Sequence, residues 1–168
     1  MRFVPPPSIA LLKSALSYDP ETGVFTWANP TGRRRRVGDI AGSTGRGHVS
    51  IQIGNGRWFA HRLAWLWVHG EWPDTGIGHI NGDGCDNRIA NLRKATPGQN
   101  LQNQWKAHRE NETGALGVRK RFHRYHASIT VEGRRLHIGA FRTVEQAANA
   151  YLQKKRELHP FGDVAKSA

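Results

Sequence analysis

Three polar residues in the middle of the chain have types and spacings that could support acid–base and metal chemistry. His79 lies in the stretch GIGHINGDGC, residues 76–85, whose four glycines suit neither a helix interior nor a buried strand. Asn91 follows twelve residues after His79, and Asn100 follows nine residues later. A histidine titrates near neutral pH and can take a proton from water, and an amide oxygen can bind a hard divalent cation. These residues could place a general base beside one metal ion.

Local patterns predict the elements that would bring these residues together. We expect a strand that ends at His79, a turn through the glycine-rich loop, and a second strand in LRKAT, which begins at Leu92. Thr96 and Gln99 form a capping-box pattern around Pro97, so a helix should begin there. Such a ββα unit would fold the histidine and the second asparagine toward the same point.

The same region resembles the HNH, or His-Me finger, endonucleases, and specifically the phage and intron-encoded homing branch in which the last histidine of the motif is an asparagine. The resemblance covers about residues 9–105 and lies in HRLAW at 61–65, HINGD at 79–83, DNRIANLR at 86–93 and ATPGQN at 95–100. It implies a ββα-metal core at about 76–105, hydrolysis of a DNA phosphodiester, and one Mg²⁺ (or Mn²⁺) ion as cofactor.

The resemblance also implies a role for each residue of the motif. His79 would be the general base that activates the attacking water. Asn91 would hold the loop and orient the imidazole, and Asn100 would bind the metal ion through its amide oxygen. The metal ion would neutralise charge on the scissile phosphate. Because related monomeric enzymes act on one strand at a time, we expect nicking by a monomer bound to double-stranded DNA.

Gly78 departs from the family pattern, which usually has a metal-binding aspartate at this position. Glycine offers no ligand atom, and hard cations prefer carboxylates, so the affinity for Mg²⁺ should fall. The glycine could be a natural loss in a decayed enzyme, a deliberate substitution, or a variant in which Asp83 or Asp74 compensates. We expect weak or absent cleavage, and the alternative function is a catalytically dead DNA-binding protein or regulator derived from an HNH endonuclease.

The segment before the motif predicts a small mixed α and β region. A short helix should begin at Ile9 after an N-cap at Ser8. A strand is expected at 24–27 and a β-hairpin around Gly54-Asn55-Gly56. The apolar run that Gly70 ends predicts a buried helix, with His61 at its head as a structural residue that pairs by hydrogen bond.

The C-terminal third has a different pattern, which follows a polar stretch at 106–113 that looks like a linker. Three strands are expected in GVRKRF, YHASITV and RRLHIGAF, followed by a helix that Thr143 and Gln146 cap. This region, 114–162, resembles an AP2 DNA-binding domain, which lays a three-stranded antiparallel sheet in the major groove. We therefore expect an α+β chain with an HNH domain at 1–105, this AP2-like domain, and a tail at 163–168.

Basic residues are the candidate DNA contacts. Alternation along the strands puts one set on a single face of the expected sheet, and these match DNA-facing positions of the AP2 family: Arg119, Arg121, Ser128, Thr130, Arg135 and His137. Four consecutive cations, Arg33, Arg34, Arg35 and Arg36, form a glycine-flanked loop suited to phosphate contacts. The alternative in both places is a solvated basic surface.

The overall charge agrees with a polyanionic partner. The chain carries 25 Lys and Arg residues against 13 Asp and Glu residues, a formal net charge of +12. An anionic membrane is a poor alternative, because the sequence has neither a basic amphipathic helix nor a long apolar segment.

The N-terminal residues lack a signal-peptide pattern, so we expect a cytoplasmic protein of a bacterial or phage-infected cell. The single Cys85 excludes an internal disulfide.

Overall fold

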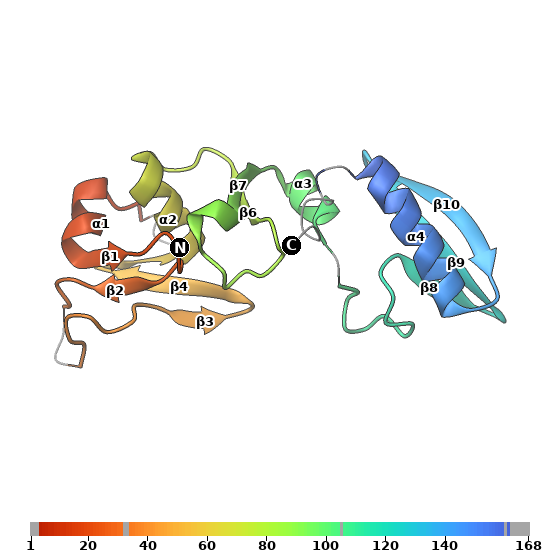
Figure 1. The fold of residues 1–168 in the computed structure, drawn as a ribbon, viewed down its shortest axis with the longest axis horizontal. Helices are drawn as coiled ribbons and strands as arrows, with labels where there is room; N and C mark the ends of the chain where they lie inside the picture. Colours follow the sequence, from red (N-terminus) through yellow and green to blue (C-terminus); the bar gives the residue numbers. More distant parts are fainter. Residues whose placement is uncertain (1–3, 32–33, 105, 160, 162–168) are drawn as a thin grey trace. The chain divides into compact units, whose positions relative to one another are not determined.

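The computed structural model describes residues 4–31, 34–104, 106–159 and 161, and it divides the chain into two compact units, Met1–Thr96 and Pro97–Ala168. Each unit mixes helices with small antiparallel sheets (Figure 1), so the expected α+β class is confirmed. The units divide before residue 105, where we expected the first domain to end, and the expected domain bounds stay a prediction. In the described part of the chain, no helix is both long and apolar enough to cross a membrane.

In its described residues, the first unit contains two helices, three small sheets and one 3₁₀ turn. In chain order these are α1 (Ile9–Ala15), β1 (Leu16–Tyr18), β2 (Phe25–Trp27), β3 (Ser43–Gly45), β4 (His48–Ile53), β5 (Gly56–Phe59), α2 (Ala60–His69), β6 (Gly76–His79), η1 (Ile89–Asn91) and β7 (Leu92–Ala95). β1 pairs with β2, β3 with β4 and β4 with β5, and β6 with β7.

The ends of the first two helices follow from local chemistry. The Ser8 hydroxyl caps α1 by accepting a hydrogen bond from the backbone N–H of Leu11 at 3.2 Å, as expected. Gly70 ends α2 in the left-handed conformation, with φ of 75°, which glycine adopts without strain. Both helices bury apolar residues in one core, where Leu12 and Leu63 are fully buried.

The β6–β7 hairpin positions the central motif. The two strands are antiparallel, with His79 opposite Leu92 and Gly78 opposite Arg93. Ile77 and Leu92 belong to the core of the first unit, which anchors the hairpin. The strand that ends at His79 and the returning strand are therefore confirmed.

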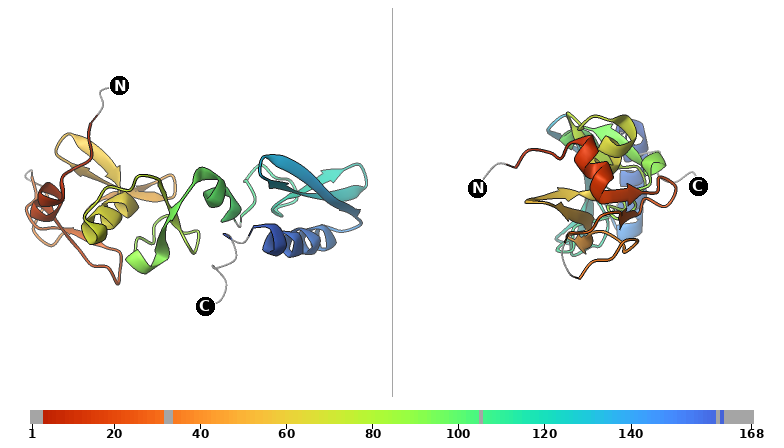
Figure 2. Two further views of the ribbon diagram at one scale, coloured as in Figure 1. Left: turned by 90° about the horizontal axis from the view of Figure 1, so that it is seen from above. Right: turned by 90° about the vertical axis from the view of Figure 1, so that its left-hand side faces the viewer.

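The second unit begins with the short helix α3 (Pro97–Gln102), followed by β8 (Val118–Arg121), β9 (Arg124–Val131), β10 (Arg134–Phe141) and α4 (Val144–Leu158). The strand order is β10-β9-β8, and α4 lies along one face of this sheet (Figure 2). The turn between β9 and β10 is Glu132–Gly133, and both residues have positive φ, as a two-residue hairpin turn requires. Thr143 caps α4 by accepting from the N–H of Gln146. The three strands and the covering helix are as predicted.

Two features of this unit differ from the simple sequence pattern. Lys155 is 2% exposed on the inner side of α4, burial lowers its pKa to about 8, and its Nζ donates to the carbonyl oxygen of Gln104. Asn111, within the expected linker, donates through Nδ2 to the carbonyl oxygens of Ala115 at 2.9 Å and Val118 at 3.2 Å. The end of the linker segment is therefore bonded to the sheet.

Candidate functional site

His79 lies at the end of β6 and is only 6% exposed. Its Nε2 is 3.4 Å from Oδ1 of Asn87, which is itself 3% exposed. The Asn87 amide is oriented because its Nδ2 donates to the carbonyl oxygen of Cys85 at 3.0 Å. Oδ1 can only accept, so Nε2 of His79 carries the proton and Nδ1 keeps its lone pair.

Burial sets the charge of this imidazole. Loss of solvent lowers the pKa of His79 below its ordinary value, and the contact with Asn87 and the carboxylates of Asp83 and Asp86 oppose the effect without cancelling it. A lowered pKa leaves the ring neutral at pH 7, which is the form in which an imidazole can act as a base.

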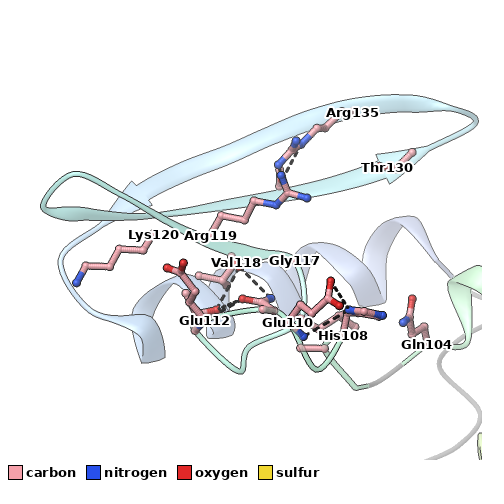
Figure 3. A pocket seen from close by; sticks show the side chains of 15 residues that line it. Gln104, His108, Glu110, Glu112, Gly117, Val118, Arg119, Lys120, Thr130 and Arg135 are labelled. Atoms are coloured by element: carbon pink, nitrogen blue, oxygen red, sulfur yellow. Dashed lines mark hydrogen bonds and ion pairs between the residues drawn. The ribbon is translucent and has the colours of Figure 1, made fainter.

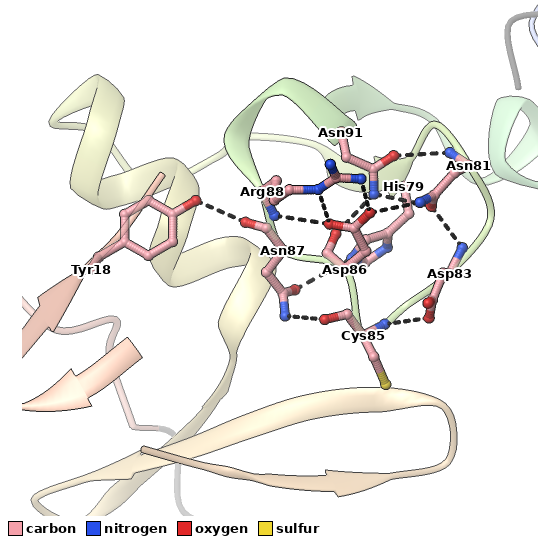
Figure 4. A network of polar contacts seen from close by, with 9 residues as sticks. All are labelled: Tyr18, His79, Asn81, Asp83, Cys85, Asp86, Asn87, Arg88 and Asn91. Atoms are coloured by element: carbon pink, nitrogen blue, oxygen red, sulfur yellow. Dashed lines mark hydrogen bonds and ion pairs between the residues drawn. The ribbon is translucent and has the colours of Figure 1, made fainter. Parts of the chain in front are cut away.

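Asn91 braces the loop that follows His79 (Figure 4). Its Nδ2 donates to Oδ1 of Asn81 at 3.0 Å and to the carbonyl oxygen of Asp86 at 2.8 Å. Its Oδ1 accepts from the N–H of Asn81 at 2.9 Å. These bonds hold the two ends of the turn at 81–86 together, and the catalytic role expected for Asn91 stays a prediction.

Asn87 has a position that the sequence did not predict. It contacts the imidazole directly, and its carbonyl oxygen accepts a hydrogen bond at 2.8 Å from the hydroxyl of Tyr18 on β1. The resemblance assigned the orientation of the imidazole to Asn91, whereas the structure places Asn87 against Nε2. Asn87 lies within DNRIANLR, so the motif contained it, but only the fold reveals its contact with β1.

The structure supplies few of the metal ligands that the resemblance implies. Gly78 is buried on β6 and offers no side-chain donor. Asn100 lies half-buried on α3, within the second unit, and its role at His79 stays a prediction. Asp74, one candidate for compensation, forms an ion pair with Lys94 at 3.0 Å. Asp83, the other, accepts through Oδ1 from the N–H of Cys85 at 2.9 Å.

Two further histidines surround His79. His48 begins β4 and His61 lies in the first turn of α2, and one side-chain nitrogen from each of the three rings lies within 4.8 Å of the others. Three histidines at this spacing could form a metal site. His61 is 8% exposed and stacks on Phe59, with ring centroids 5.3 Å apart. The hydrogen-bonded pairing expected for His61 is not found at its Nδ1 among the described residues.

The basic loop of the first unit is only partly described. Arg33 lies outside the described residues, and Arg34, Arg35 and Arg36 are exposed. The Arg35 guanidinium lies over the ring of Trp27, 4.6 Å from its centroid. This contact holds one cation against the first unit.

The strand register of the second unit places the predicted DNA contacts together. Ser128 pairs with His137 and Thr130 with Arg135, and all lie on the face opposite α4. Arg135 donates to the Ser128 hydroxyl through Nε at 2.9 Å and through an Nη at 2.7 Å. By the same register Arg119 and Arg121 pair with two residues that sequence reasoning omitted, His126 and Arg124.

A cavity of about 710 Å³ lies against this sheet face (Figure 3). Arg119 and Arg135 line it from the strands, and His108, Glu110 and Glu112 line it from the preceding segment. The segment expected to be only a linker therefore borders the predicted DNA-binding face.

Comparison with known proteins supports one part of this interpretation. The chain matches no curated protein and no solved structure. Residues 59–102 match the family model described as HNH endonuclease, a class that generally uses a divalent metal. The matched segment contains α2, the β6–β7 hairpin and α3, and with them His61, His79, Asn91 and Asn100. It supports a DNA-hydrolysing nuclease domain of the HNH type in this chain.

Proposed function

We propose that the chain is a DNA endonuclease of the phage or mobile-element homing type, which nicks double-stranded DNA with His79 as its general base. The observation that carries the proposal is the position of His79 within the HNH match: a buried imidazole at the end of β6, with a lowered pKa and with Nε2 against Oδ1 of Asn87. The neutral imidazole takes a proton from the attacking water, and Asn87 and Asn91 hold the ring and its loop in place.

The residues at the expected Mg²⁺ site fit a hard cation poorly. Gly78 supplies no oxygen, Asp74 is paired with Lys94, and an amide such as that of Asn100 is a weaker ligand than a carboxylate. When bound, a divalent ion would supply charge neutralisation at the phosphate.

The second unit would supply affinity for the target as an AP2-like module. Its face carries Arg119, Arg121 and Arg135 beside polar groups, and a planar guanidinium can grip guanine or phosphate with two hydrogen bonds. The net charge of +12 favours the same polyanion.

The test is incubation of the full chain with supercoiled plasmid and Mg²⁺ or Mn²⁺. Nicking that is lost in His79→Ala and kept in His69→Ala, a change at an exposed histidine at the end of α2, would support the proposal. Equal nicking by wild type and His79→Ala would refute the role of His79.

A second function, a DNA-binding protein or regulator derived from such an enzyme, is favoured by Gly78. It predicts plasmid binding without any cleavage that depends on His79. A gel-shift assay beside the nicking assay separates the two functions. DNA binding without cleavage would support the regulator and contradict the endonuclease.

A further inference from the structure

Three separate elements bring three imidazoles to one point in the first unit. His48 comes from β4, His61 from α2 and His79 from β6. The ring centroids of His61 and His79 are 5.0 Å apart. The ring centroid of His48 lies 5.5 Å from that of His61 and 5.6 Å from that of His79. One nitrogen from each ring lies within 4.8 Å of the others.

Two of these rings have polar atoms without protein partners. Among the described residues, Nδ1 of His48 and Nδ1 of His61 are buried and accept or donate no hydrogen bond. A buried polar atom without a partner is costly, so native proteins generally satisfy such atoms with protein, water or a bound ion.

The charge state of the cluster also suits a cation. An imidazole has an ordinary pKa of about 6.5, so it is mostly neutral at pH 7. Neutral imidazoles do not repel a metal ion, and each offers one lone pair.

We propose that His48, His61 and His79 form a binding site for a borderline divalent transition metal, with Zn²⁺ as its representative. Imidazole suits Zn²⁺, Ni²⁺ and Cu²⁺, whereas Mg²⁺ demands oxygen ligands. Zn–N bonds of about 2.0–2.1 Å require nitrogens about 3.3 Å apart in a tetrahedron, so nitrogens that now lie within 4.8 Å of one another must approach by at most about 1.5 Å. The fourth position is left for water or another oxygen ligand.

This site is distinct from the Mg²⁺ site that the HNH resemblance implies. It uses no aspartate before His79 and no residue of α3, and its residues span two hairpin strands and one helix of the first unit. It rests on the arrangement of the rings and not on nuclease activity, so a failed nicking assay would leave it standing.

The first experiment measures Zn²⁺ binding by the full chain in competition with a chromogenic chelator. We expect one tightly bound Zn²⁺ per chain, and at least a tenfold loss of affinity in His48→Gln, whose ring is half-buried and therefore the easiest of the three to replace. His69→Gln, at an exposed histidine in the same unit, should bind Zn²⁺ as the wild type does. Wild-type affinity in His48→Gln would overturn the site.

A second control addresses the other unit, where the His126 and His137 rings lie 5.5 Å apart. His137→Gln should retain binding, and a loss there would place the metal on the second unit and overturn the proposal. Zn²⁺ should also raise the unfolding midpoint reported by tryptophan fluorescence in the wild type but not in His48→Gln. An equal rise in both would refute binding at the cluster, whether or not His48→Gln folds less well.

Discussion

Replacing Asn91 by alanine tests whether the loop after His79 is held as the structure indicates. The side chain makes three hydrogen bonds, at 2.8, 2.9 and 3.0 Å, and all join it to Asn81 or Asp86. A hydrogen bond in a folded protein contributes about 1 kcal/mol, so the loss of three should cost about 3 kcal/mol. Asn91 is buried, so water cannot readily replace the lost bonds.

The assay is urea unfolding followed by tryptophan fluorescence. Five of the six tryptophans lie in the first 96 residues, so the signal reports mainly the first unit. The matched control is Gln52→Ala, which removes an exposed amide whose described bond, to the carbonyl oxygen of Gly54, is 3.3 Å long. It should cost about 0.5 kcal/mol or less. A cost for Asn91→Ala no greater than that of Gln52→Ala would refute the bracing network.

Three further predictions concern charge, metal and DNA. The pKa of His61 is about 3 in the folded chain, against an ordinary value of 6.5. Between pH 6.5 and pH 3 only the unfolded chain binds this proton, so the free energy of unfolding falls with a constant slope as the pH is lowered. His61→Gln should reduce that slope of unfolding free energy by about 1.4 kcal/mol per pH unit, and an unchanged slope would contradict the buried neutral ring. Gly78→Asp should restore nicking that requires Mg²⁺. Equal cutting by the wild type and by Gly78→Asp would show that the missing carboxylate does not limit cleavage. The double change Arg119→Ala with Arg121→Ala should lower the salt slope of DNA binding by up to about 2, against no change for Arg156→Ala on α4, and an unaltered slope would show that the sheet face does not bind phosphate.

The sequence predicted the elements best where the pattern is local. The β9–β10 turn at Glu132–Gly133 and the cap at Thr143 depend on residues within four positions of each other, and both appear where expected. The strand that ends at His79 was also recoverable, because the glycine-rich loop marks its end.

The contacts between distant segments were not predictable in the same way. His48 and His61 join His79 only because β4, α2 and β6 pack on one core, and no spacing in the sequence encodes that meeting. Asn87 was hidden for a similar reason, since its anchor, Tyr18, lies 69 residues away. Lys155 is a different case, because it stands four residues after the buried Tyr151, and helical spacing could have placed it on the inner face.

His79 links the two proposals, because one atom serves both. Asn87 engages Nε2, so Nδ1 is the lone pair that could take a proton from water or bind a metal ion, and it cannot do both at once. A hard cation has little affinity for imidazole and would leave the base intact, whereas Zn²⁺ would compete with the proton. If both proposals hold, Zn²⁺ suppresses any nicking that depends on His79, and His48→Gln, which weakens Zn²⁺ binding without removing the base, restores it. Suppression of equal strength in His48→Gln would show that Zn²⁺ acts elsewhere.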